Sequence, residues 1–252
     1  MSTMSNQSAA GKTVTKKELA ELMVGSELPS PETEESTVTD QVLLDLKDVN
    51  LIDEGGRYLL KDINLTIHKG EVLGIAGVEG NGQAELVETI MGMRQSTGHI
   101  TLNGDDLIDN DTRERREAGV GFIPEDRHHH GLLLDAPLWE NRVLGHQTRP
   151  PSAKGWLIDR VGARKDTDRI VSEYDVRTPS IDTHARALSG GNQQKLIVGR
   201  EMSGNPILLI AAHPTRGVDV GAQAAIWDHI KRARREGLAV LLISADLDEL
   251  IG

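Results

Sequence analysis

A glycine-rich turn between an apolar run and a helical pattern has the residue types and spacing of a phosphate-binding loop. Its candidate binding residues are Gly77, Glu79, Gly80, Asn81, Gly82, Gln83 and Ala84. Glycines in such a turn allow backbone N–H groups to point inward at an anion. The same spacing also suits a simple tight turn, so the loop by itself leaves both interpretations open.

Two side chains that phosphate loops use are absent from this turn. Gln83 stands where a lysine would reach the β- and γ-phosphates, and Ala84 stands where a hydroxyl would bind magnesium. Each lost charge-assisted contact is worth about 1.5 to 3 kcal/mol, so the two together cost roughly 3 to 6 kcal/mol. That is on the order of a hundredfold to ten-thousandfold in affinity. We therefore expect weak nucleotide binding at most.

A second turn, Leu188-Ser189-Gly190-Gly191-Asn192, opens a predicted helix. Ser189 is suited to cap that helix, and the free N–H groups of a helix N-terminus attract phosphate. The candidate residues for this contact are Ser189, Gly190, Gly191 and Asn192. The alternative is a helix cap with no ligand.

The elements that position these turns alternate between strand and helix. Apolar residues recur with period two near Val42 and Ile63, and short apolar runs predict buried strands at 72–76, 120–123, 207–210 and 238–243. Helical patterns fall at 136–144, 160–174, 192–202 and 222–236. Strands that alternate with helices predict an α/β fold with a parallel sheet, here with an antiparallel β piece and a helical subdomain at about 127–187.

Composition limits the function classes. The 252 residues carry 28 basic and 39 acidic side chains, a net charge of -11 that disfavours nucleic acid as a partner. No cysteine is present, which removes disulfides and thiolate metal sites. No run approaches the ~20 apolar residues that span a bilayer, and we expect a cytoplasmic setting.

The ordered set of motifs resembles an ATP-binding-cassette (ABC) transporter ATPase. It comprises the phosphate-loop frame at 77–84, Leu188-Ser-Gly-Gly-Asn-Gln at 188–193 and Pro-Thr-Arg-Gly-Val-Asp at 214–219. Together with Pro-Glu-Asp-Arg at 124–127, the motifs look most like the C-terminal cassette of tandem ATPases that serve sugar and nucleoside importers. The resemblance implies a P-loop NTPase fold with a parallel sheet core, an antiparallel β subdomain and an inserted helical subdomain. It also implies ATP, with Mg²⁺, as the cofactor.

Residue by residue, this sequence departs from the family pattern. The magnesium-binding aspartate falls on Ala212, the glutamate that polarises water on His213, the switch histidine on Ala245, and the glutamine of the membrane-side loop on Glu125. The resemblance therefore implies a degenerate cassette with no catalytic residue and no metal ligand of its own. We expect the chain alone not to hydrolyse ATP.

In the family, two cassettes close head to tail, so the signature of one covers the ATP of the other. The resemblance therefore implies that residues 189–192 complete the ATP site of an intact N-terminal or partner cassette. It also implies transmembrane permease subunits as partners, a solute-binding protein indirectly, and a peripheral position on the cytoplasmic side of the membrane. The alternatives are a scaffold module that binds no nucleotide and a fully active ABC ATPase.

Several features have simpler explanations. Residues 1–40 hold three lysines and seven carboxylates and are expected to be a tail or inter-cassette linker, with a short helix at about 15–25. The cassette-like domain is expected at 41–252 and to be truncated at its C-terminus. His128–His130 is expected to be a solvated loop, and Lys231–Arg235 a cationic helix end. Tyr58 is a candidate to stack on adenine by family analogy.

Overall fold

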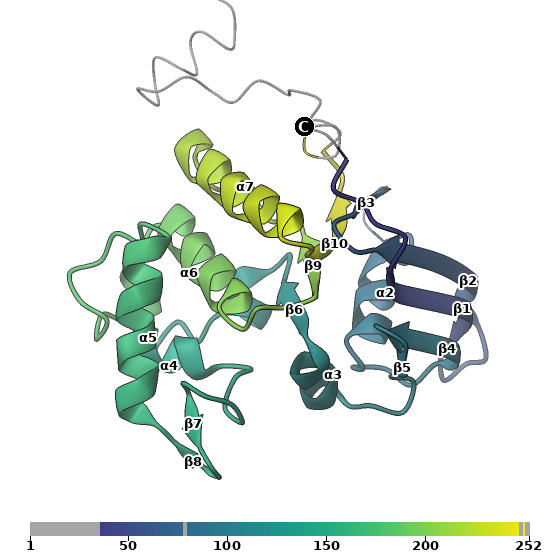
Figure 1. Ribbon diagram of the computed structural model, residues 1–252, viewed down its shortest axis with the longest axis horizontal. Coiled ribbons are helices and arrows are strands. Elements are labelled where there is room, and N and C mark those ends of the chain that lie inside the picture. Colours follow the sequence, from purple (N-terminus) through teal and green to yellow (C-terminus); the bar gives the residue numbers. More distant parts are fainter. Residues whose placement is uncertain (1–35, 78–79, 247–248, 250–252) are drawn as a thin grey trace, which may run out of the picture.

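Four strands form an antiparallel sheet in the order β2-β1-β4-β5 (Figure 1). Their bounds are β1 (Val42–Ile52), β2 (Tyr58–His68), β4 (Thr97–Leu102) and β5 (Asp105–Asp106). Leu44 and Leu46 of β1 are buried, and Leu44 lies opposite Ile67 of β2 and Leu102 of β4. The period-two pattern therefore turns one face of this sheet toward the core, as the sequence predicts.

The second sheet is parallel, with the order β3-β10-β9-β6. Its strands are β3 (Val72–Ala76), β6 (Val120–Ile123), β9 (Leu208–Ala212) and β10 (Ala239–Ser244). Every residue of β9 and β10 is buried. Such strands read as continuous apolar runs because both faces of a parallel sheet are covered. The predicted α/β class, with a parallel sheet and an antiparallel β subdomain, is confirmed.

The helices begin where the sequence supplies caps. Their bounds are α2 (Gln83–Ile90), α3 (Thr112–Ala118), α4 (Leu138–Val143), α5 (Arg160–Glu173), α6 (Gly190–Met202) and α7 (Val220–Arg235). Asp111, Asp159, Ser189 and Asp219 each accept a hydrogen bond from a backbone N–H of the first turn that follows. These contacts satisfy donors that a helix start leaves without partners.

Two apolar cores cover the two faces of the parallel sheet. Leu208, Ile210 and Leu241 pack on one face with α2 and the antiparallel sheet. Successive side chains of a strand point to opposite faces. Leu209 and Leu242 therefore pack on the other face, with α4, α5, α6 and α7. Figure 1 shows α6 and α7 on the side away from the antiparallel sheet. The carboxyl ends of β6 and β9 are therefore fixed from both faces.

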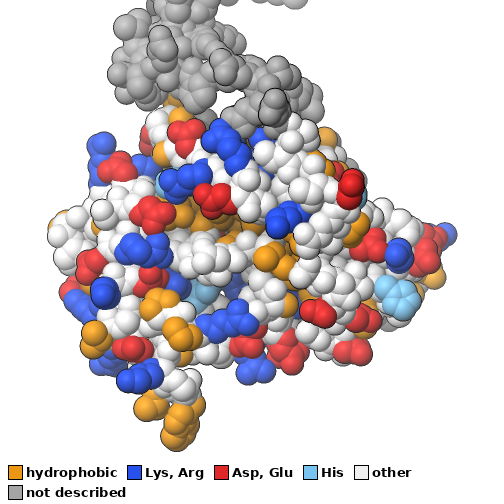
Figure 2. Space-filling model, in the orientation of Figure 1, with side chains coloured by type: hydrophobic (Ala, Val, Ile, Leu, Met, Phe, Trp, Pro, Cys, Tyr) orange, Lys and Arg blue, Asp and Glu red, His pale blue; other side chains and the backbone are white. Residues whose placement is uncertain are grey.

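The segment between the two sheet strands β6 and β9 is mainly helical. It contains a π-helical turn, η1 (Arg127–Gly131), then α4, α5 and a 3₁₀ turn, η2 (Ala185–Ala187). The sequence did not predict the short hairpin of β7 (Ala153–Lys154) and β8 (Leu157–Ile158), which projects from this segment. Trp156 at its tip is 95% exposed. Figure 2 shows hydrophobic side chains on the corresponding projection.

The structure describes residues 36–77, 80–246 and 249. The short helix expected at about 15–25 and most of the expected 1–40 linker lie outside these residues. At the start of the described part, residues 36–41 run beside the β2–β3 turn, where Thr39 N donates to Lys69 O at 3.0 Å.

Candidate functional site

The predicted phosphate loop joins β3 to α2. Gly77 follows the strand, and Gly82 caps the helix with a φ of 98°, a left-handed conformation that glycine adopts without strain. Gly80 also has a positive φ, of 89°. The predicted contact Glu79 lies outside the described residues. The described part of the loop, Gly77 and residues 80–82, thus leads directly into the α2 N-terminus, which has no side-chain cap.

Gln83 folds back across this loop. Its Oε1 accepts a hydrogen bond from the Asn81 N–H at 3.1 Å. A Cβ atom placed on Gly77 would come within 2.2 Å of Gln83 Nε2. The side chain that replaces the expected lysine therefore occupies the inside of the turn and binds one of the N–H groups there. A phosphate entering the turn would have to displace it.

A cavity of about 550 Å³ lies at the carboxyl ends of β6 and β9, next to the start of α2. Its apolar lining includes Ala84, Val87, Met93, Phe122, Ala212 and Ile243. Ala84 and Ala212 occupy the two positions at which the family supplies magnesium ligands. Neither side chain has an oxygen atom, so these two positions offer no ligand to a Mg²⁺ ion.

The remaining departures from the family pattern are also placed by the structure. His213 has a φ of 48° and donates its N–H to Ile243 O at 2.8 Å, and it does not line the cavity. Ala245 is exposed, beside the buried Ser244. Glu125 lines the cavity and forms an ion pair with Arg216. The positions that correspond to the family's water-polarising glutamate and switch histidine therefore do not line this cavity, whose carboxylate and histidine lining residues are Glu88, Glu125, Asp126, His128 and His130.

Arg127 connects the cavity to the signature turn, a role that the sequence analysis did not assign. Its Nη1 donates to Arg216 O at 2.8 Å. A Cβ atom on Gly190 would lie 2.8 Å from Arg127 Nη2. The motifs Pro-Glu-Asp-Arg and Pro-Thr-Arg-Gly contain both arginines, but 89 residues separate them and their contact is a product of the fold.

The signature turn keeps its predicted geometry. Ser189 Oγ accepts from the Asn192 N–H at 3.4 Å and from Asn192 Nδ2 at 2.9 Å. Asn192 Oδ1 accepts from the Arg177 N–H at 2.8 Å. Ser189 is exposed, whereas Gly191 is buried against Asp219. The turn thus presents a capped helix N-terminus at the surface, where an anion has access to it.

Other candidates lie apart from these two turns or on the rim of the cavity. His128 contacts Gln193 Oε1 at 3.0 Å through Nε2, and His129 contacts Asp126 at 3.1 Å. Within the described residues, no group of three or more His, Cys, Asp or Glu is placed to hold a metal ion. Tyr58 is 51% exposed at the start of β2 and lies 5.7 Å from the Lys61 ammonium.

Comparison with known families matches residues 60–216 to the model described as ABC transporter. This match spans more than half of the chain, and the chain therefore belongs to the ABC transporter family, whose ATPases bind ATP with Mg²⁺. Among solved structures, the dimeric structure of the bacterial ABC transporter cassette MJ0796 has a TM-score of 0.69 and 23% identity. The superposition covers 82% of this chain and 89% of the MJ0796 chain, which confirms the fold.

Three curated relatives are import ATP-binding proteins. The guanosine import protein NupO of Bacillus subtilis is 45% identical, covering 93% of this chain and 46% of its own length. The nucleoside import protein NupA of Lactococcus lactis is 40% identical, with 94% and 47% covered. The glucose import protein TsgD13 of Haloferax volcanii is 41% identical, with 94% and 44% covered. The chain spans about half the length of these relatives.

These similarities confirm the resemblance to cassettes of nucleoside and sugar import proteins. Among the described residues, no helix has the length and apolar character needed to cross a bilayer.

Proposed function

We propose that this chain is the second, degenerate cassette of an ABC importer for nucleosides or simple sugars. In this proposal it supplies the signature turn to the ATP site of a partner cassette. The single observation that carries the proposal is the contrast between the two helix starts. The α2 start has Gln83 folded into the loop, whereas the α6 start has an exposed, capped turn at Ser189.

Weak ATP binding at the chain's own phosphate loop is expected because three positions lack the side chains that phosphoryl transfer requires. Phosphoryl transfer needs a cation on the phosphates, a metal held by oxygen ligands and an oriented water molecule. Gln83, Ala84 and Ala212 provide neither the cation nor the metal ligands. His213, at the position of the water-polarising glutamate, does not line the cavity. We therefore propose that the chain alone does not hydrolyse ATP.

The relatives support the tandem arrangement and the class of solute. The matched region is 46% of the guanosine import protein and 47% of the nucleoside import protein, so each has room for a second unit of similar size. Two of the three relatives are named for nucleosides and one for glucose. We propose permease subunits as direct partners, an indirect link to a solute-binding protein, and a peripheral position on the cytoplasmic side of the membrane.

The test measures ATP turnover when this chain is combined with its intact partner cassette. Ser189→Arg places a bulky cation on the exposed turn, and we expect it to abolish turnover of the pair. Ser172→Arg, at an exposed serine on α5, is the matched control and should leave turnover unchanged. Unchanged turnover with Ser189→Arg would contradict the proposal.

Two further measurements separate the alternatives. Mg²⁺-dependent turnover by the purified chain alone would favour a fully active ATPase. Association with the partner cassette that is equally strong with and without ATP would favour a scaffold that binds no nucleotide. The proposal expects no turnover alone and association that strengthens with ATP.

A further inference from the structure

Three arginines from different elements converge around one buried carboxylate, away from the phosphate loop. Arg116 belongs to α3, Arg142 to α4 and Arg200 to α6, and their side chains are only 15%, 2% and 3% exposed. Glu201 lies between Arg116 and Arg200 and is fully buried. Buried charges are uncommon unless they are paired. The question for this cluster is therefore which carboxylate pairs with each arginine.

Glu201 is saturated by its neighbours. Arg116 donates to it from Nη1 at 2.8 Å and from Nη2 at 3.0 and 2.9 Å, and Arg200 Nε donates at 2.8 Å. The Phe122 N–H adds a bond at 3.1 Å. Burial by itself would raise the pKa of Glu201, but the attraction of Arg200 and Arg116 keeps the pKa below its usual value. Glu201 is therefore ionised and has little capacity left for Arg142.

Arg142 is incompletely paired. Its Nε donates to Asp166 at 2.5 Å, but its Nη1 is buried without a hydrogen-bond partner. Asp166 also accepts from the more exposed Arg169 at 2.8 Å. The buried Arg142 and Arg200 and the partly buried Arg116 thus face two carboxylates, one of which is shared with a fourth arginine. The cluster carries an excess of positive charge.

His146 adds a second buried polar atom without a partner, at Nε2. Burial lowers the pKa of His146 to about 4; Glu201 opposes the shift, while Arg142, Arg116 and Arg200 add to it. The ring is neutral at pH 7. Two unpartnered polar atoms therefore lie in a region that already holds surplus positive charge.

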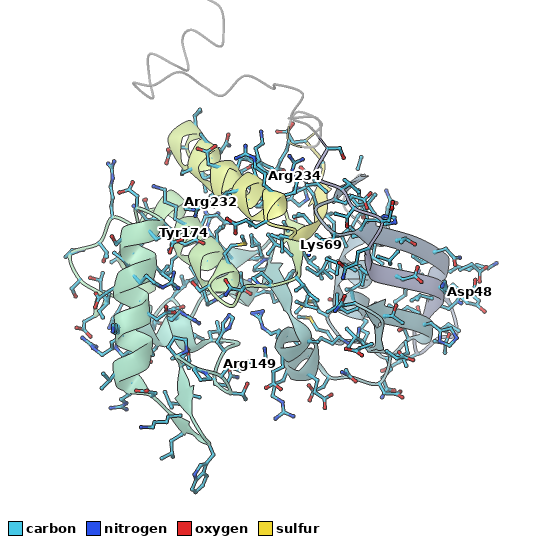
Figure 3. The ribbon with its side chains drawn as sticks, in the orientation of Figure 1. Asp48, Lys69, Arg149, Tyr174, Arg232 and Arg234 are labelled. Atoms are coloured by element: carbon cyan, nitrogen blue, oxygen red, sulfur yellow. The ribbon has the colours of Figure 1, made fainter. Side chains whose placement is uncertain are left out.

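A cavity of about 230 Å³ opens at this cluster. Its lining includes Arg116, Arg142, His146, Arg149, Glu201 and Asn205. Figure 3 shows Arg149 in the region between α3 and α4. Glu117 is the acidic group on the rim, and it accepts a hydrogen bond from Thr148 Oγ1 at 2.5 Å. The cavity has room for a small anion in front of guanidinium groups.

The loop after α4 packs closely against Arg116 at Gly145. Gly145 has a φ of 78°, and a Cβ atom there would lie 2.6 Å from Arg116 Nη2. Any side chain at this position would displace the guanidinium. Glycine thus allows the loop after α4 to lie directly on Arg116.

We propose that this cavity, between α3, the end of α4 and the end of α6, binds one oxyanion group, such as a carboxylate, sulfate or phosphate. Guanidinium groups bind such oxygens with charge-assisted hydrogen bonds. The group has two conceivable sources: a free small anion, or an acidic side chain of another protein. The site is independent of the nucleotide loop because it lies at the start of β6, whereas the other cavity lies at its end.

The first experiment titrates the whole chain with sodium sulfate, phosphate and formate, with chloride at matched ionic strength. NMR of the His146 ring and the Arg142 side chain reports on the cavity. The oxyanions should shift both signals saturably and raise the pKa of His146, because a nearby negative charge favours the protonated ring. Chloride should not. The absence of a saturable shift with all three oxyanions would overturn the proposal.

Variants then test the location. Arg149→Ala removes an exposed cation of the rim and should weaken oxyanion binding by about tenfold. Arg113→Ala removes an exposed arginine from α3 that does not line the cavity, and it should leave binding unchanged. An equal loss in both variants would overturn the location, because it would indicate general surface attraction.

The second experiment identifies the source and rests on the proposed permease partner. Arg149→Lys is incorporated into the assembled transporter, which is treated with a carbodiimide that joins an amine to a neighbouring carboxylate. A cross-link from Lys at position 149 to a permease carboxylate assigns the anion to that protein. No cross-link, with retained sulfate binding by the chain, assigns the site to a free anion. Because oxyanion titration needs no permease, failure of the proposed function leaves the first experiment decisive.

Discussion

The cavities at the two ends of β6 differ in how deeply their charged groups are buried. At its carboxyl end, Ala84 and Ala212 line a space where the family places charge and metal. At its start, the buried Arg142 and Glu201 and the partly buried Arg116 line a smaller space. The same strand therefore separates a cavity whose charged lining residues, such as Glu125 and Arg216, are partly exposed from a cavity whose charged lining residues Arg142 and Glu201 are buried.

This difference shows that Glu201 remains buried as an ion because other parts of the chain supply its counter-charges. Glu201 is held by two arginines and one backbone N–H. A lone lysine or aspartate in the larger cavity would have needed a bound nucleotide or metal as its counterpart. Replacing such groups with Gln and Ala removes that requirement.

The largest expected effect comes from restoring the lysine and the hydroxyl of a phosphate loop to the start of α2. In the double variant Gln83→Lys with Ala84→Thr, ATP affinity should rise by on the order of a hundredfold or more, because two charge-assisted contacts together supply roughly 3 to 6 kcal/mol. Titration calorimetry with Mg²⁺ and ATP measures it. Gln147→Lys adds the same charge at an exposed site and should have no such effect. An unchanged affinity in the double variant would show that the loop frame itself is closed to phosphate.

The next effect removes charge from the smaller cavity. Glu201→Gln leaves Arg116 and Arg200 buried without their shared carboxylate, which should lower the free energy of unfolding by about 3 to 5 kcal/mol. Chemical denaturation gives the value. The exposed Glu140→Gln on α4 should change it by less than about 0.5 kcal/mol. Similar losses in both variants would contradict the contrast between the cavities.

The pH dependence of stability provides another test of the smaller cavity, through His146. The folded-state pKa of His146 is about 4, below its ordinary value of 6.5, so the unfolded chain takes up a proton first as the pH falls. Stability is complete above pH 6.5 and falls by about 3 kcal/mol as the pH drops toward 4. The difference between the native chain and His146→Gln, measured by denaturation, isolates this contribution. Parallel curves for the two proteins would be the contrary result.

The smallest effect concerns an ion pair at the larger cavity. The Glu125 and Arg216 side chains are 38% and 54% exposed, and solvent screens such pairs. Glu125→Gln should therefore alter the free energy of unfolding by no more than about 1 kcal/mol, well below the effect of Glu201→Gln. A loss as large as that of Glu201→Gln would mean that both cavities depend on paired charge to the same degree.

Local patterns predicted most of the fold. The apolar runs at 207–210 and 238–243 became β9 and β10, and Ser189 caps α6 as its residue type indicates. Element ends moved by a few residues because caps such as Asp219 and Pro137 decide them. The β7–β8 hairpin was missed because two-residue strands leave no periodic signal.

The sequence also indicated both helix starts of the candidate site, but contacts across long separations were beyond it. The arginines Arg127 and Arg216 meet across 89 residues, and Arg116 reaches Glu201 across 85. Nothing local in Gly-Arg-Glu-Met at 199–202 distinguishes a buried carboxylate from an exposed one. Likewise, the position of the Gln83 amide inside its own turn depends on the backbone path of Gly77 and Asn81.

The projecting β7–β8 hairpin carries a tryptophan whose fluorescence can be distinguished from that of the other two. Of the three tryptophans, Trp139 and Trp227 are half-buried, whereas Trp156 is almost wholly in water. Its indole should therefore contribute the long-wavelength part of the fluorescence and be quenched readily by iodide. Any surface that covers the hairpin will shift this emission to shorter wavelength, so assembly can be followed without a label.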